Sequence, residues 1–182
     1  FCPESRLSGI GRHFEEGAPL WYRRRFLLPE GFRRERVLLH IGAADQIAEV
    51  FVNGQYLCRH EGGYASFCVD ITEALAEENE LVIRCTDDLH DQAFPYGKQV
   101  MNRGGMWYTP VSGIWQTVWI EPVPAANRIE GVTTRSDIHA GVLSVDVKTA
   151  RTGSDRVCVT LSADGKTLAE RSSMAGQPVH LA

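Results

Sequence analysis

The sequence predicts an all-β protein, on two observations. Apolar and polar residues alternate with period two along most of the chain, in short runs rich in Val, Ile and aromatic residues that Gly, Asp, Asn or Pro separate. A single stretch, residues 70–75, has the pattern of a short helical turn, with Asp70 or Thr72 as its candidate cap. About ten strands without a helix of ordinary length indicate stacked sheets: a larger sandwich, then part of a smaller one.

The first part of the chain contains most of the expected strands. We predict them at residues 21–28, 36–41, 48–53, 55–60, 66–71, 80–86 and 114–121. Asn53-Gly54 lies between two of them, and this dipeptide favours a type I′ hairpin turn. Trp115 and Trp119 are separated by an even number of positions in the last strand, so we expect both on one side, with Trp119 in the core.

A domain boundary is predicted near Pro122-Val123-Pro124, which should end the last strand, and small residues follow it. We therefore expect one domain over residues 1–124 and another over 125–182. The second has predicted strands at 129–135, 142–150, 156–163 and 166–171, with a hairpin turn at Asp164-Gly165. Such short strands resemble an immunoglobulin-like sandwich, which normally has about 100 residues, so we expect this one to be truncated. A start at Phe1-Cys2 without Met also suggests a piece of a longer protein.

Composition excludes several classes of protein. The chain has 182 residues, 43% of them hydrophobic and 23% charged, which argues against disorder, and its net charge of −4 argues against binding to nucleic acid or an anionic membrane. No apolar stretch approaches the ~20 residues of a membrane span. Five cysteines without C-x-x-C spacing favour buried thiols in a reducing compartment, so we expect a cytoplasmic protein with no metal or cofactor. The oligomeric state stays open, a homo-oligomer included.

Five motifs in order carry a family resemblance. They are VFVNG (50–54), HEGGY (60–64), DIT (70–72), NELVI (79–83) and SGIWQTV (112–118). Together they resemble the N-terminal sugar-binding domain of glycoside hydrolase family 2, which includes β-galactosidases, β-glucuronidases and β-mannosidases. The resemblance implies a jelly-roll, galactose-binding-like β-sandwich followed by the truncated immunoglobulin-like one. It also implies a carbohydrate substrate and a (β/α)₈ barrel, farther along the parent chain, that holds both catalytic glutamates.

No catalytic residue is predicted within this chain. Retaining glycoside hydrolysis needs two carboxyl groups about 5–5.5 Å apart. The adjacent pairs Glu15-Glu16 and Glu77-Glu78 lie in a loop and at a turn, where they are most simply solvated charges that point apart. The segment alone should therefore be inactive.

The long irregular segment 87–111 is the candidate binding region, because loops beyond ~12–15 residues are usually functional or disordered and this one is rich in aromatic residues. Aromatic rings stack on sugar C–H faces, and amide or amine groups bind hydroxyls. Our carbohydrate-binding candidates are Lys98, Gln99, Trp107 and Tyr108. The alternative is that the aromatic rings pack the loop against the sandwich or the barrel. Galactosidase- and glucuronidase-like members have a substrate-binding aspartate where this chain has Trp107, so the sugar cannot be transferred from the resemblance.

Three functions compete at this point. The leading one is a non-catalytic wall of the active site of a β-glycosidase that hydrolyses O-glycosidic bonds in carbohydrate metabolism. The second is a free-standing, lectin-like carbohydrate-binding module, and the third is a structural domain that docks the barrel or a second subunit. The sequence beyond Ala182 would separate them.

Overall fold

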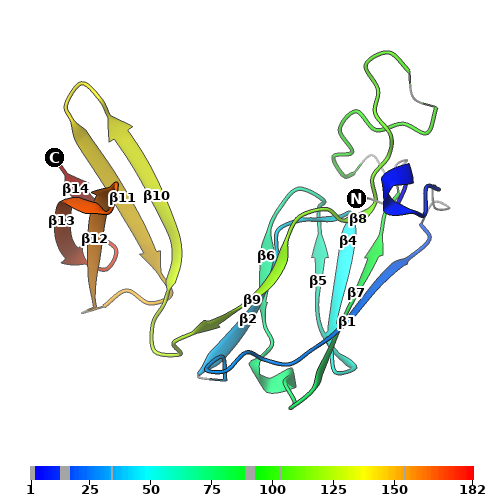
Figure 1. Ribbon diagram of the computed structural model, residues 1–182, viewed down its shortest axis with the longest axis horizontal. Helices are drawn as coiled ribbons and strands as arrows, with labels where there is room; N and C mark the ends of the chain where they lie inside the picture. The colour runs from blue at the N-terminus through cyan, green and yellow to red at the C-terminus, as the bar shows by residue number, and fades with distance from the viewer. Residues whose placement is uncertain (1–2, 13–16, 34, 89–92, 103, 154) are drawn as a thin grey trace. The chain divides into compact units, whose positions relative to one another are not determined.

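The structure is a computed structural model, and it describes residues 3–12, 17–33, 35–88, 93–102, 104–153 and 155–182 (Figure 1). The chain divides into two compact units, Phe1–Val123 and Pro124–Ala182. Strands dominate both, and the helical elements of the described part are two 3₁₀ turns, η1 (Arg6–Ser8) and η2 (Thr72–Ala74). The all-β prediction is confirmed. Phe1, Cys2 and the Glu15-Glu16 pair lie outside the described residues.

The first unit is built from antiparallel sheets. One sheet has the order β1 (Leu20–Phe26), β7 (Asn79–Thr86), β4 (Ile47–Val52), β5 (Gln55–Glu61). The second has the order β6 (Phe67–Asp70), β2 (Arg36–Ile41), β9 (Val118–Val123). A third pairs the two-residue strands β3 (Ala44–Asp45) and β8 (Gly113–Ile114). The long segment after β7 and the η1 turn lie at the end of this unit that carries β8, and the β4–β5 turn lies at the opposite end (Figure 1).

Period-two alternation places the core of the first unit. In β4, Ala48, Val50 and Val52 are fully buried and alternate with partly exposed residues, as expected for a strand with one face on a core. They share one cluster with Leu39 and Ile41 of β2, so the core joins the two main sheets. Burying each of the Val, Leu and Ile side chains contributes about 1.5–3 kcal/mol.

The prediction of one continuous strand over residues 114–121 is wrong, because the segment forms two strands. A bend at Gln116 separates β8 from β9, where the Gly42 amide bonds the Thr117 carbonyl at 2.9 Å. Trp115 and Trp119 therefore do not share a strand. Trp119 is also not a core residue, because it is 45% exposed and stacks on His40 with ring centroids 4.8 Å apart.

The last strand of the first unit also runs farther than expected. β9 continues through Pro122, which pairs with Val37 of β2, and ends at Val123. A proline lacks the N–H that a central strand needs, but β9 lies at the edge of its sheet. The expectation that Pro122 would end the strand neglected this edge position.

Both predicted hairpin turns are present. Asn53 and Gly54 have φ of 51° and 80°, and Asp164 and Gly165 have φ of 51° and 74°. Positive φ at both central residues is the requirement of a type I′ turn, which Asn or Asp followed by Gly meets at low cost. These two turns fix the register of β4 with β5 and of β12 with β13.

The second unit has five strands in two sheets. One has the order β10 (Ile129–Asp137), β11 (Val142–Thr149), β14 (Val179–Leu181), and the other pairs β12 (Arg156–Ala163) with β13 (Lys166–Met174). The short β14 was not predicted. Its core comprises six buried residues: Val145, Val147, Val157, Ala175, Val179 and Leu181. Within the described part of either unit, no helix has the length and apolar character needed to cross a membrane.

Candidate functional site

The predicted binding loop has a defined backbone where the structure describes it. We call residues 96–111 the aromatic loop. Gln99 and Tyr108 form a parallel bridge, in which the Tyr108 amide donates to the Lys98 carbonyl at 2.8 Å and the Val100 amide to the Tyr108 carbonyl at 3.1 Å. The Trp107 amide donates to the Gly104 carbonyl at 3.2 Å and closes a turn. Main-chain pairing thus brings the four predicted residues into two facing segments.

Three of these residues expose their side chains. Trp107 is 42% exposed and Tyr108 is 65% exposed, and Lys98 is also exposed. An exposed aromatic ring can stack on a sugar, and an exposed ammonium group can donate hydrogen bonds to it.

Gln99 is directed differently, into the protein. Its amide nitrogen donates to the Tyr96 carbonyl at 2.9 Å, and its oxygen accepts from the Val111 amide at 2.5 Å. The same side chain hydrogen-bonds the Asp45 carboxylate. Both N–H donors of a primary amide are thus engaged inside the chain, so the structure places Gln99 as a link between loop and sandwich.

Beneath this loop lies a cluster of carboxyl groups that we call the acid cluster: Glu4, Asp45 and Asp87. Glu4 and Asp45 are 7% and 6% exposed. Glu4 Oε1 accepts from the Ser112 amide at 3.1 Å, and Glu4 Oε2 is buried with no hydrogen-bond partner among the described residues. Gly63 lies against Asp45 so closely that a Cβ there would fall 2.1 Å from Oδ1. Only a glycine fits at that position.

Burial raises the pKa of two carboxyl groups of this cluster, Asp45 and Asp87. It raises the pKa of Asp45 to about 7, with a further rise from the charge of Asp87, while the Gln99 hydrogen bond opposes the rise. Burial likewise raises the pKa of Asp87; the bond from the Ser112 hydroxyl opposes this, and the charges of Glu4 and Asp88 add to it. Near neutral pH, Asp45 therefore keeps its proton in part of the molecules, whereas an isolated carboxyl group would have lost it.

Sequence reasoning missed two exposed aromatic residues beside the loop. Tyr64 and Trp115 are 54% and 43% exposed, and their rings meet edge to face with centroids 5.9 Å apart. The Trp115 indole donates to the Gly63 carbonyl at 2.8 Å, and the Tyr64 hydroxyl lies against Gly97 of the loop. The available signal was that both rings flank a glycine turn rather than a strand interior.

Asp45 was also missed. Its signal was a single acidic residue within the mainly apolar run 37–48, where an ordinary surface charge is unexpected. Sequence alone did not show that Asp87 and Glu4 would join it.

A groove of about 860 Å³ opens between the edge strands β1 and β9 of the first unit, but it does not suit a sugar. Tyr22, Phe26, Leu39 and Trp119 are among its mainly apolar lining residues. A sugar requires hydrogen-bonding groups that fix its hydroxyls. The loop end of the unit supplies these better.

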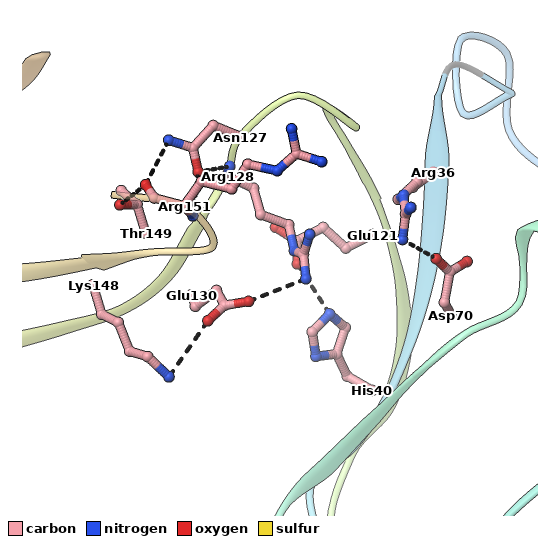
Figure 2. Close-up of polar contacts among 10 residues, drawn as sticks. All are labelled: Arg36, His40, Asp70, Glu121, Asn127, Arg128, Glu130, Lys148, Thr149 and Arg151. Atoms are coloured by element: carbon pink, nitrogen blue, oxygen red, sulfur yellow. Dashed lines mark hydrogen bonds and ion pairs between the residues drawn. The ribbon is translucent and has the colours of Figure 1, made fainter. Parts of the chain in front are cut away.

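Charged pairs elsewhere are of the ordinary surface kind (Figure 2). In the first unit, Arg36 bonds Asp70 at 2.9 Å. His40 Nε2 lies 3.0 Å from Glu121 Oε2 but forms no hydrogen bond, so that contact attracts only when the imidazole is protonated. Exposed pairs of this type contribute about 0–1 kcal/mol. Within the described ranges, no group of three His, Cys, Asp or Glu residues is placed to hold a metal ion.

Comparison with known proteins identifies the family. The model of the glycosyl hydrolase 2 galactose-binding-like domain matches residues 13–106, more than half of the chain. The chain belongs to this family. It is 31% identical over 104 residues to a β-galactosidase of Thermoanaerobacter pseudethanolicus, a match that covers 56% of this chain and 13% of that protein. It is 28% identical over 181 residues to the β-glucuronidase of Rattus norvegicus, covering 87% of this chain and 28% of that protein. This glycosyl hydrolase 2 chain thus spans less than a third of the length of these relatives.

Solved structures show the same fold. A β-glucuronidase from Ruminococcus gnavus, determined with D-glucuronic acid, superposes with a TM-score of 0.70 at 23% identity and covers 92% of this chain and 31% of that one. The β-sandwich architecture of this family member is therefore shared with glycoside hydrolases.

Proposed function

We propose that this chain is the non-catalytic N-terminal portion of a family 2 β-glycosidase, and that its aromatic loop forms one wall of the active site. The reacting glutamates would belong to a (β/α)₈ barrel elsewhere in the same parent protein. Family membership supports the proposal, as do relatives named β-galactosidase and β-glucuronidase that are several times longer than this chain.

The observation that carries the proposal is the placement of Trp107 and Tyr108. Their exposed rings stand on a hydrogen-bonded bridge with the exposed Lys98 close by in the backbone. Because main-chain bonds fix the backbone that carries these rings, less backbone entropy is lost when a ligand stacks on them, which favours binding.

Catalysis by the chain itself does not fit the carboxyl groups that it brings together. A retaining glycosidase presents two carboxyls to the sugar, about 5–5.5 Å apart. In the acid cluster, Glu4 and Asp45 are more than nine-tenths buried, so a sugar cannot reach them. We expect no hydrolysis of aryl β-glycosides by the 182-residue chain. Turnover that disappears when one of its carboxylates is mutated would contradict this.

The wall role can be tested in the parent enzyme by comparing Trp107→Ala with Trp119→Ala. The two indoles are similarly exposed, 42% and 45%, so the two losses of packing should be alike. Trp107→Ala should raise KM roughly tenfold with little change in Tm, because a stacking ring is lost, whereas Trp119→Ala should leave KM unchanged. A lower Tm with normal KM in Trp107→Ala would make that ring structural.

Titration of the isolated chain with monosaccharides distinguishes the proposed active-site wall from the lectin-like alternative. An incomplete pocket buries too little of a ligand to offset the entropy lost on binding, so we expect no measurable affinity. Micromolar affinity for a simple sugar would favour a free-standing binding module.

A further inference from the structure

The acid cluster is held by contacts from segments that are far apart in the sequence. Asp45 belongs to β3, Asp87 follows β7, and Glu4 lies in the N-terminal segment. Burial of several like charges is costly unless opposite charges or protons compensate. Among the described residues, the groups that act on Asp45 are Asp87, Cys85 and Gln99, and none of these is a cation. Protons are therefore the available compensation.

Gln99 connects this cluster to both ends of the aromatic loop. Its bonds reach the Tyr96 carbonyl near the start of the loop and the Val111 amide at its end. Its third bond reaches Asp45 on the sandwich. Adjacent to Gln99, the bridge to Tyr108 sets the backbone on which Trp107 and Tyr108 stand. One side chain thus ties the shape of the loop to the buried carboxyl.

We propose that Asp45 and Gln99 are positioning residues that fix the aromatic loop on the sandwich, and that the hold is stronger when Asp45 is protonated. The claim about loop position concerns this chain alone. Its consequence for sugar binding rests on the proposed function.

The direction of the pH effect follows from the groups around Asp45. Cys85 faces Asp45 from β7, and Asp87 faces it from the segment after β7. Gln99 faces Asp45 from the aromatic loop, and Gly63 covers it from the turn after β5. Glu4 and Asp88 act on Asp87 in turn. If the loop detaches, water reaches Asp45 and its pKa falls from about 7 towards the 3.8 of a solvated aspartate.

The Gln99 hydrogen bond by itself favours the ionised carboxyl, but the desolvation of Asp45 is the larger effect, so detachment of the loop releases a proton. A group whose pKa is raised in the ordered state stabilises that state fully below its ordinary pKa, and the stabilisation is lost as pH rises through the raised value. The hold on the loop should weaken between about pH 4 and about pH 7 and stay weak above that.

Hydrogen exchange of the loop amides tests the proposal. The reporters are Val100, Tyr108 and Val111, whose amides bond within the loop, and the reference is Ile71, whose amide bonds the Val37 carbonyl in the sandwich. After correction for intrinsic rates, protection of the three reporters should fall by roughly tenfold or more from pH 5 to pH 8, while that of Ile71 stays constant.

Matched variants test whether Asp45 and Gln99 cause the pH dependence of loop protection. Asp45→Asn keeps an oxygen that accepts from Gln99 but cannot ionise, so the pH dependence of its loop protection should be much smaller, with only a remainder from Asp87. Gln99→Ala should lower reporter protection at every pH. Asp146→Asn, at an exposed pair with Arg135 in the second unit, should retain the pH dependence of the original chain.

Two results would overturn the proposal: equal reporter protection at pH 5 and pH 8 in the original chain, or an unchanged pH dependence in Asp45→Asn. If Asp45→Asn does not fold, NMR titration of the Asp45 carboxyl carbon in the original chain decides, because an ordinary pKa would also overturn it. None of these measurements uses a sugar, so failure of the glycosidase assignment would leave them unaffected.

Discussion

At the scale of single residues, Gly63 is the position where one added methyl group should be most costly. Its Cβ would fall 2.1 Å from Asp45 Oδ1, and that carboxyl is buried and bonded to Gln99. We expect Gly63→Ala to lower the free energy of unfolding of the first unit by about 2–3 kcal/mol. Gly104→Ala is the control, because nothing lies within 4 Å of its Cβ position. Urea unfolding curves measure both, and equal midpoints would show that the site relaxes freely.

Residue positions that depend on local chemistry could be predicted from the sequence, and those that depend on remote contacts could not. Asn53-Gly54 was predictable because positive φ at two successive residues is a local requirement. The burial of Asp45 arises from Gly63, Asp87 and Gln99, which are distant in the sequence. Exposure of Trp119 was mispredicted because spacing arguments assume a continuous strand. Whether Lys98, Trp107 and Tyr108 bind sugar stays a prediction.

At the scale of elements, the two hairpin turns share a conformation but differ in their bonds. The side-chain Nδ2 of Asn53 donates to the Ala74 carbonyl at 2.8 Å and to Asn79 Oδ1 at 3.0 Å. The side-chain Oδ1 of Asn53 accepts from the Glu80 backbone amide at 2.8 Å. This turn therefore also anchors the start of β7. Asp and Asn both tolerate the turn geometry, so Asn53→Asp tests the bonds alone.

We expect Asn53→Asp to destabilise the first unit by about 1–3 kcal/mol, because a carboxylate would face two acceptors that lose their donor. Asp164→Asn makes the reverse exchange in the β12–β13 turn and should change the stability of the second unit by less than about 0.5 kcal/mol. Thermal unfolding followed by circular dichroism measures both effects. Similar small effects in the two turns would show that the Asn53 bonds contribute little.

Element boundaries were predictable where a strand has its own hydrophobic pattern. The strands β2 and β12 have the predicted bounds, since each alternates clearly between punctuating residues. The two-residue strands β3 and β8 were missed because they exist only through mutual pairing, Ala44 with Ile114 and Asp45 with Gly113. No local propensity signals a strand of that length.

At the scale of the whole molecule, the fold class followed from period-two alternation, but the function did not. A β-sandwich supports many activities, so the function rests on the family match over residues 13–106 and on the exposed rings of the loop. Specificity was not predictable, because the resemblance implies an aspartate of other branches at the position of Trp107, and an indole accepts no hydrogen bond.

The two units should also differ in stability. The first has ten residues in its buried cluster and the second has six. Eight of the nine residues of β10 are exposed, including Val132 at 58%, so this strand adds little apolar burial.

We expect opening of the second unit to require about 2 kcal/mol less free energy than opening of the first. Amide exchange in increasing urea measures this, with Val145 as reporter of the second unit and Val50 as reporter of the first. The expected result is earlier loss of protection at Val145, because fewer aliphatic side chains leave water on folding of its unit. Identical protection and a single shared transition would instead mean that the units fold as one cooperative body, and the difference in core size would then have no energetic consequence.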